Sequence, residues 1–341
     1  MTPRPLLQES AATLKALCSS CGLPKTGTKA LLVGRLRHAA QHFRPVPPSA
    51  RILSIDLGIK NFAFSLLTPA TPSKTKPPPS TSPLTSPVYL HAWYRLDLTL
   101  PLPNNKKPSK PPPSKEEETS KEKDPFSPPA LASLTLSLLH SHLLPLNPTH
   151  VLIERQRFRT GGGAAVAEWT LRVNSLEAML HAAFAALNGR KGTGGGWEGT
   201  VGCVLPRAVA GFLFPSSEGE GEGGDEGEGR KGRGGAYQVL KREKVGLMGG
   251  FLKERSGLVL PEEGQAEEMV RLFLRGLEER ERRGGKRGPG KKGEKEVEEF
   301  VTKMDDLSDA VLQGMVWLQW QRNLEGLIRE RPELLEDEVG E

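Results

Sequence analysis

A carboxylate inside an apolar run is the feature that most constrains this chain. From Ile52 to Leu57 the sequence is Ile-Leu-Ser-Ile-Asp-Leu, which is typical of a strand covered on both faces. Gly58 then allows a tight turn into a second apolar stretch that ends at Leu67. A buried carboxylate is costly unless something pairs with it, and a metal ion is the usual partner. We therefore expect the rest of the chain to bring further carboxylates, or nucleic acid, to Asp56.

The N-terminal residues 5–44 predict two helices joined by a turn, and Leu6, Leu7, Leu14 and Leu17 suit the first of them. In the second helix Leu31, Leu32, Leu36 and Ala39 fall on one face. The segment LKALCSSCGLPKTGTKALLVGRLRHA resembles the SAP motif, a helical DNA-binding hairpin. A helix N-terminus offers free amides to phosphate, and basic side chains beside it strengthen that contact. The residues assigned to this DNA contact are Lys25, Lys29 and Arg35.

The same unit contains a zinc-finger-like spacing, Cys18-x2-Cys21 followed by His38-x3-His42. The gap between the two pairs is longer than the usual twelve residues, and the segment between them lacks a strand pattern. We therefore interpret Cys18 as a small apolar residue of a helix rather than as a zinc ligand.

Two later segments extend the predicted sheet. Residues 88–98 have strand character, and residues 149–155 form an apolar run that ends in Glu154. A Leu-rich helix, residues 131–144, separates them and predicts a crossover that lays the later strand parallel to the first. Asp56 and Glu154 would then lie at neighbouring carboxyl ends, where open α/β sheets place their sites.

Polar and basic residues follow both strand ends and are expected to contact a phosphate backbone. A glycine-rich segment, residues 161–163, makes the second of these loops flexible. The residues assigned to this contact are Lys60, Gln156, Arg157 and Arg159.

A late helix from about Lys295 to Glu330 carries Asp305 and Asp309, which share one face because they are four residues apart. Together with Asp56 and Glu154 they form a set of hard oxygen ligands suited to Mg²⁺, with Mn²⁺ as a possible substitute. Two such ions activate water and stabilise the leaving oxygen in phosphodiester hydrolysis. A single acid of this kind is more often a helix cap or a solvated side chain. The hypothesis of a metal site therefore depends on all four acids together.

The segments SIDLGIKNFAF, LIERQRFRTGGG, RVNSLEAMLHAA and KMDDLSDAVLQGMVWLQW resemble the fungal mitochondrial Holliday-junction resolvases, which are RNase H-like nucleases related to bacterial RuvC. The resemblance implies an α/β fold with an RNase H-like mixed five-stranded sheet and flanking helices, a homodimer, a mitochondrial location, and magnesium-dependent symmetric cleavage of four-way DNA junctions. Asp56, Glu154, Asp305 and Asp309 would be the metal-binding acids. Asp306 is an alternative to Asp305, because related nucleases use a three-residue spacing.

A homodimer also follows from the two-fold symmetry of a junction. Helix 164–187 is the first candidate interface, and the alternative is that this apolar helix belongs to the core. We expect a SAP-like unit in residues 1–48 and a nuclease domain in residues 49–341. Other expected elements are a strand at 200–205, helices at 206–214 and 261–283, and a basic surface at 237–253. Extended or disordered insertions are expected near 69–87, 101–129, 189–199, 216–235 and 284–294.

Composition is compatible with these expectations without deciding among them. The 341 residues carry 47 Lys and Arg against 41 Asp and Glu, a net charge of +6, which suits nucleic acid. Three cysteines do not make a disulfide framework, and no apolar run approaches membrane-spanning length. No clear mitochondrial presequence is visible.

Three rival functions remain open at this stage. The segment from Asp56 to Asn61 resembles the first phosphate loop of actin-like sugar kinases and ATPases, which need a second Asp-x-Gly loop. An RNase H-like nuclease that cuts a hybrid or a flap would use the same acids. A non-catalytic DNA-binding protein would rely on the SAP-like unit alone.

Overall fold

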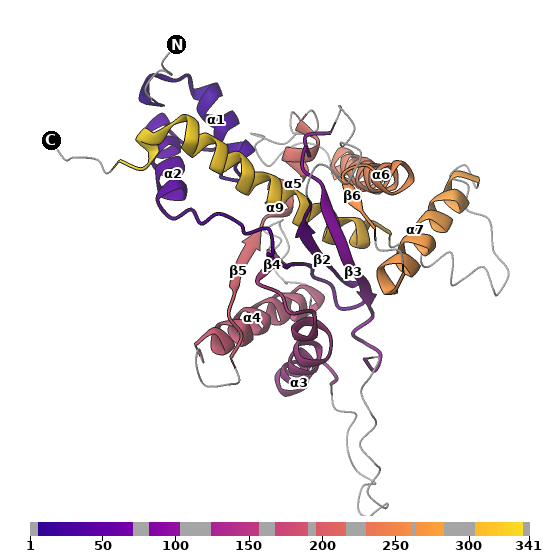
Figure 1. The fold of residues 1–341 in the computed structure, drawn as a ribbon. Coiled ribbons are helices and arrows are strands. Elements are labelled where there is room, and N and C mark those ends of the chain that lie inside the picture. The colour runs from indigo at the N-terminus through magenta and orange to yellow at the C-terminus, as the bar shows by residue number, and fades with distance from the viewer. Residues whose placement is uncertain are drawn as a thin grey trace, which may run out of the picture.

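The computed structural model places most of the chain in one sheet flanked by helices, with a small helical unit at the N-terminus (Figure 1). Residues described by the structure are 6–70, 82–102, 124–156, 168–189, 196–215, 230–260, 263–282 and 304–336. Among these residues, no helix has both the length and the apolarity that crossing a bilayer requires.

The sheet has six strands in the order β5-β4-β1-β2-β3-β6. Strands β1 (Ile52–Asp56), β2 (Phe62–Pro69) and β3 (Val88–Leu96) form an antiparallel meander. Strands β4 (His150–Glu154) and β5 (Thr200–Val204) continue the sheet in parallel from β1. The predicted mixed RNase H-like sheet is confirmed. A two-residue strand, β6 (Leu258–Val259), pairs with the start of β3 and was not predicted.

Helices cover both faces of the sheet, and the sheet separates two apolar cores. On one face lie α5 (Pro206–Leu213), α6 (Arg230–Glu254), α7 (Gln265–Arg282) and α9 (Met304–Glu330). On the other face lie α3 (Pro128–Leu138) and α4 (Glu168–Asn188). The helix predicted at 131–144 is present, but after Leu138 it continues as a π-turn (Leu139–Leu143) and a 310 turn (Leu144–Leu146).

Helix α9 is seated on β1 and β2 by close packing and directed hydrogen bonds. The Gln313 side-chain amide donates to Ser54 Oγ at 3.1 Å and to the Ile55 carbonyl oxygen at 3.2 Å. Trp93 Nε1 donates to the Leu307 carbonyl oxygen at 2.9 Å. At Gly314 the helix comes so near the sheet that a Cβ atom would lie 2.6 Å from Leu67 Cδ1. The position of α9 along the sheet is therefore fixed.

The N-terminal unit consists of a 310 turn (Leu6–Gln8), α1 (Ala11–Ser20) and α2 (Lys29–Gln41). Ser10 and Thr28 cap the two helices by accepting from backbone amides three residues on. The core of the unit is completed by Leu324, Leu327 and Leu334, from the end of α9 and the 310 turn (Pro332–Leu334) after it. Residues 1–48 therefore share a core with the rest of the chain.

Two expectations about the N-terminal helices are wrong in detail. Leu31 is 49% exposed, and the inward face of α2 is formed instead by residues that include Val33 and Ala40. Leu6 lies in a separate 310 turn because Ser10 starts a new helix. Cys18 and Cys21 are buried in the unit's core, and His42 Nδ1 contacts the His38 carbonyl oxygen at 2.8 Å.

The expected insertions fall mostly outside the described residues. The described parts correct two of their boundaries. Helix α3 begins at Pro128, inside the segment predicted to be disordered, and helix α6 begins at Arg230, inside the Gly-Glu tract. The basic surface expected at 237–253 belongs to α6, which faces α9 and the sheet core.

Replacing Gly314 with Val is predicted to destabilise the protein, because the added side chain must displace Leu67 and Ser54 beneath α9. Overpacking of this kind costs about 1–3 kcal/mol. Gly326→Ala, in the same helix, is the control, since a Cβ there meets no atom within 4 Å. Chemical denaturation should give a lower unfolding free energy for Gly314→Val alone. Equal values for both variants would contradict the close seating of α9.

Candidate active site

The first two acids lie side by side at the carboxyl ends of neighbouring strands. In the parallel pairing of β1 with β4, Ile55 is opposite Ile153, so Asp56 and Glu154 are the next residues along each strand. Asp56 is 8% exposed, and its carboxyl group shares a hydrogen bond with Glu154. The Gln156 side-chain amide donates to Glu154 Oε2 at 3.0 Å and orients it. The predicted meeting of these strand ends is therefore observed.

Helix α9 brings its first two turns to the same place. Asp305 is 7% exposed, whereas Asp306 and Asp309 are half-buried. Negative charge on Asp309 and Asp306 acts on Asp56, and Glu154 acts on Asp309. The four predicted acids and the alternative Asp306 thus form one electrostatic cluster, defined here as the acidic cluster.

Two lysines of α6 pair with the α9 acids. Lys244 Nζ lies 2.6 Å from Asp309 Oδ1, and Lys241 forms an ion pair with Asp305. Lys244 is 8% exposed and also feels the charges of Asp56 and Glu154. The five carboxyl groups of the acidic cluster therefore outnumber these two lysines.

Burial and the closeness of these acids shift their pKa values. Burial and the neighbouring Glu154 raise the pKa of Asp56 well above its ordinary value. Burial also raises the pKa of Asp306 to about 7, with the charge of Asp305 as the next cause. Burial raises the pKa of Asp309 as well, although Lys244 opposes the shift. For Lys244, burial favours the neutral form, but Asp309, Asp56 and Glu154 together outweigh burial and the pKa is raised.

The acidic cluster fits a divalent cation by its donor chemistry. Its ligand atoms are carboxylate oxygens from β1, β4 and α9, which suit Mg²⁺ or Mn²⁺ rather than a soft metal. Its acids outnumber their lysine partners, so added positive charge relieves the repulsion that raises the pKa values of Asp56 and Asp306. The residues present therefore fit a metal of this class.

The predicted DNA contacts are distributed over two regions. Lys60 is exposed in the turn after β1, near Asp56, and Gln156 contacts Glu154. Arg157 and Arg159 lie outside the described residues. In the N-terminal unit Lys29 is exposed at the start of α2, and Lys25 lies in the turn before it. Arg35 donates to the carbonyl oxygens of Pro24 and Thr26, so its observed role is to hold that turn.

Sequence reasoning missed several residues of the site. Lys241 and Lys244 were assigned to a basic surface, but they point into the acidic cluster. Their i, i+3 spacing was a signal of a shared helical face, which only tertiary packing directs toward α9. Glu177 accepts from the Gln156 backbone amide at 3.0 Å, a contact that no sequence pattern indicates.

Comparison with known proteins agrees with the fold described above. The profile of a family described as "Mitochondrial resolvase Ydc2 / RNA splicing MRS1" matches residues 52–327, which is most of the chain. The chain belongs to this family. A SAP-domain profile matches residues 10–41. Both resemblances found in the sequence are thereby confirmed.

Individual relatives of this Ydc2/MRS1-family chain support the same assignment. The mitochondrial cruciform cutting endonuclease 1 of Schizosaccharomyces pombe is 32% identical over 169 residues, which cover 50% of this chain. The chain spans about half, 53%, of that protein's length. The crystal structure of the yeast mitochondrial Holliday junction resolvase Ydc2 has a TM-score of 0.56 and 22% identity, covering 96% of this chain and 99% of that one. Thermus thermophilus RuvC has a TM-score of 0.30 and 12% identity over 80% of this chain and 95% of that one, and the fold assignment does not depend on it.

Without divalent metal, the stability of this Ydc2/MRS1-family chain is predicted to fall as pH rises. Asp306 has an ordinary pKa of 3.8 and a folded-state pKa of about 7, so between these values the folded state holds the proton more tightly than the unfolded state. The unfolding free energy therefore decreases with pH across this window, and the loss is complete above about pH 7. Thermal unfolding in EDTA should give a lower Tm at pH 8 than at pH 5.

Two comparisons isolate the cause of that pH dependence. Mg²⁺ binds ionised carboxylates, so it should raise the Tm more at pH 8 than at pH 5. Asp306→Asn should reduce the pH dependence measured in EDTA, because it removes the group that titrates near neutrality. An unchanged pH dependence in Asp306→Asn would show that other groups cause it.

Proposed function

We propose that this chain is a structure-selective endodeoxyribonuclease that resolves four-way DNA junctions by metal-dependent phosphodiester hydrolysis. The observation that carries the proposal is the acidic cluster, in which carboxylates from two neighbouring strand ends and one helix converge. Membership in a family whose description includes a mitochondrial resolvase supports DNA junctions as the substrate. The name of the fission-yeast relative, a cruciform cutting endonuclease, agrees with this choice.

The chain's own residues have defined tasks in this proposal. Asp56 and Glu154 hold metal from the sheet, and Asp309 holds it from α9 together with Asp305 or Asp306. Mg²⁺, when bound, supplies charge that activates water and stabilises the leaving oxygen. Gln156 orients Glu154 through its 3.0 Å hydrogen bond. Lys244 and Lys241 lower the electrostatic cost of the unmetallated acids, and their charges favour an incoming phosphate.

The SAP-like unit would contact DNA far from the cleaved bond. Helix α9 has 27 residues, with its acids of the cluster in the first two turns and the core of the N-terminal unit at the last turns. Figure 1 shows the helix reaching from the sheet to α1 and α2. At 1.5 Å per residue the helix is about 40 Å long. We infer that Lys25 and Lys29 bind the backbone of a junction arm, whereas Lys60 and Gln156 act near the acids. Arg157 and Arg159, outside the described residues, remain predicted backbone contacts.

A homodimer is part of the proposal, because two symmetric cuts require two active sites on a two-fold substrate. The predicted interface helix corresponds to α4, whose residues Leu176, Leu180 and Phe184 are fully buried in the monomer core. A partner would therefore meet other residues of α4, and Trp169 and Leu171 are its exposed large apolar side chains. A mitochondrial location is inferred from the named relatives.

The family description also includes RNA splicing, which defines the main competing function. A splicing role needs nucleic-acid binding but not a hydrolytic centre. Asp56 is buried beside other acids, at an energetic cost that binding alone does not explain. The retained acidic cluster therefore favours the nuclease.

Incubation with a panel of labelled nucleic acids is predicted to give Mg²⁺-dependent cleavage of four-way DNA junctions. The products should be symmetric nicks, because a two-fold enzyme cuts opposing strands. Matched linear duplex, an RNA–DNA hybrid, a flap and structured RNA serve as comparison substrates. Equal cleavage of junction and linear duplex would contradict junction selectivity, and cleavage of the hybrid alone would favour the general RNase H-like alternative.

Asp56→Asn is predicted to retain junction binding and to lose cleavage. The change removes a metal ligand while keeping the shape of the side chain, so activity should fall by more than about a thousandfold, a loss typical of essential catalytic groups. It should also raise the Tm in EDTA, since it removes charge repulsion with Glu154. Asp124→Asn is the control, because Asp124 is an exposed acid that pairs with Arg172. Cleavage by Asp56→Asn at the control rate would remove Asp56 from the site.

A further inference from the structure

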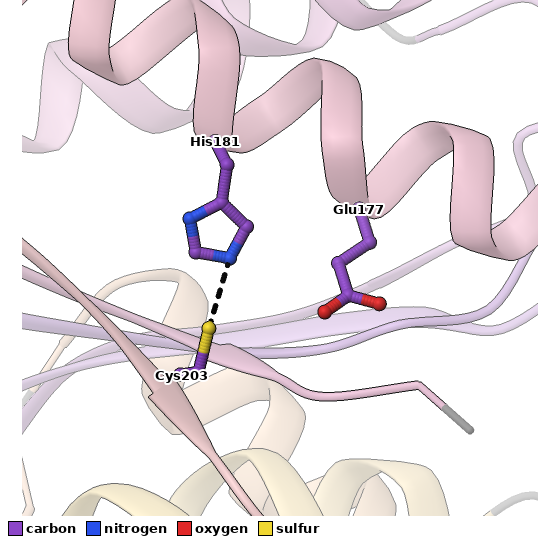
Figure 2. Close-up of side chains that lie close together, drawn as sticks. All are labelled: Glu177, His181 and Cys203. Carbon is purple, nitrogen blue, oxygen red and sulfur yellow. Dashed lines mark hydrogen bonds between the residues drawn. The ribbon is translucent and has the colours of Figure 1, made fainter.

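A second group of side chains that can bind metal lies between α4 and β5, whereas the acidic cluster is formed by β1, β4 and α9. It consists of Glu177, His181 and Cys203, and Figure 2 shows the His181 ring pointing from the helix toward the Cys203 thiol. Within the described part of the chain, this is the one set of three or more such residues whose donor atoms all lie within 4.8 Å of one another. We propose that these three side chains form a binding site for a borderline transition-metal ion, with Zn²⁺ as the ligand.

The backbone holds the three donors close together. Glu177 and His181 are four residues apart on α4, so they project from one face of the helix. Cys203 lies on β5 and faces that helix, and its Sγ atom is 3.4 Å from His181 Nε2 (Figure 2). Tetrahedral zinc with bonds of 2.0–2.3 Å requires donor atoms about 3.3–3.8 Å apart. The sulfur–nitrogen pair already has this separation.

The donor chemistry distinguishes this site from the acidic cluster. A thiolate and an imidazole favour zinc over magnesium, while the carboxylate supplies the third ligand that zinc accepts. Cys203 is exposed, so an ion can enter without opening the core. On binding, the thiol proton passes to solvent, the sulfur–metal bond forms, and no change in oxidation state is needed. Water completes the fourth position.

The surroundings supply the outer hydrogen bond that a metal-binding carboxylate usually has. Glu177 Oε2 accepts from the Gln156 backbone amide at 3.0 Å, which leaves the other oxygen for a metal. The side chain of Gln156 in turn donates to Glu154 Oε2. Metal bound at Glu177 would therefore fix the segment that orients Glu154, so the site is placed to couple metal occupancy to the geometry of the acidic cluster.

The test is a Co²⁺ titration of the purified full chain, freed of metal and free of affinity tags and DNA. Co²⁺ substitutes for Zn²⁺ and gives a thiolate-to-metal charge-transfer absorption when a cysteine binds it. The proposal predicts this absorption at one equivalent of Co²⁺ and its loss when Zn²⁺ displaces the ion. Excess Mg²⁺ should not displace it. Because the readout needs no DNA and no cleavage, its result is independent of the proposed function.

Three variants assign the absorption to these residues. Cys203→Ser should abolish it, and its exposed position makes loss of folding an improbable cause, which circular dichroism checks. His181→Ala should weaken Zn²⁺ binding by more than about tenfold. Loss of a group that only hydrogen-bonds a ligand already costs about that much, and His181 would bind the metal directly. Cys21→Ser is the control, because it removes a cysteine of the zinc-finger-like set Cys18, Cys21, His38 and His42 and should leave the absorption unchanged. Cys21 is buried, so circular dichroism also checks the folding of this variant.

The same data can overturn the proposal. Absence of the charge-transfer absorption in the parent protein would reject a cysteine-containing metal site. Retention of it in Cys203→Ser with loss in Cys21→Ser would assign the metal to the N-terminal unit instead. Equal Zn²⁺ affinity in the parent and His181→Ala would reject the Glu177, His181 and Cys203 site.

Discussion

The hydrogen bonds between helix α9 and strand β1 set the position of the acidic cluster. Gln313 reaches from the helix to Ser54 Oγ and to the carbonyl oxygen of Ile55, the residue directly before Asp56. Glycine at position 314 lets the two backbones come close enough for these contacts. The acids of α9 lie about one to two turns before Gln313, and a shift along the helix would move them away from Asp56 and Glu154.

Packing of the apolar core stabilises an arrangement that electrostatics alone would oppose. Several carboxylates lie close together, and burial raises the pKa values of Asp56 and Asp306. Helix α9 buries apolar residues along most of its length, and each such side chain contributes about 1.5–3 kcal/mol. Lys244 and Lys241 reduce the repulsion but do not match the number of acids. A divalent cation would satisfy the remaining charge, which links metal binding to the stability of the fold.

Much of this could be predicted from local sequence because each strand has a distinctive apolar run. The run around Asp56 and the run that ends in Glu154 identified two parallel strands, and the helix between them implied their order. The RNase H-like sheet, the N-terminal helical pair and the family were therefore accessible. Strand β6 was missed because two residues give no periodic signal.

What the sequence could not reveal depends on tertiary packing. Helix α6 begins in a glycine-rich segment that the sequence predicts to be disordered. Lys241 and Lys244, which the helix directs to Asp305 and Asp309, were therefore assigned to the surface. A glycine-rich segment separates Cys203 from Glu177 and His181 along the chain, and Cys203 meets them only because β5 pairs beside β4. The choice between Asp305 and Asp306 stays open, because both project from one helical turn toward the acidic cluster.

The central claim is that acids from β1, β4 and α9 bind one divalent metal centre. Anomalous scattering from Mn²⁺ in crystals of the protein bound to a four-way junction measures this directly. The account predicts density coordinated by Asp56, Glu154, Asp309 and either Asp305 or Asp306, with the Lys244–Asp309 ion pair lengthened from 2.6 Å. Mn²⁺ bound elsewhere, with both lysine ion pairs unchanged and DNA in place, would contradict it.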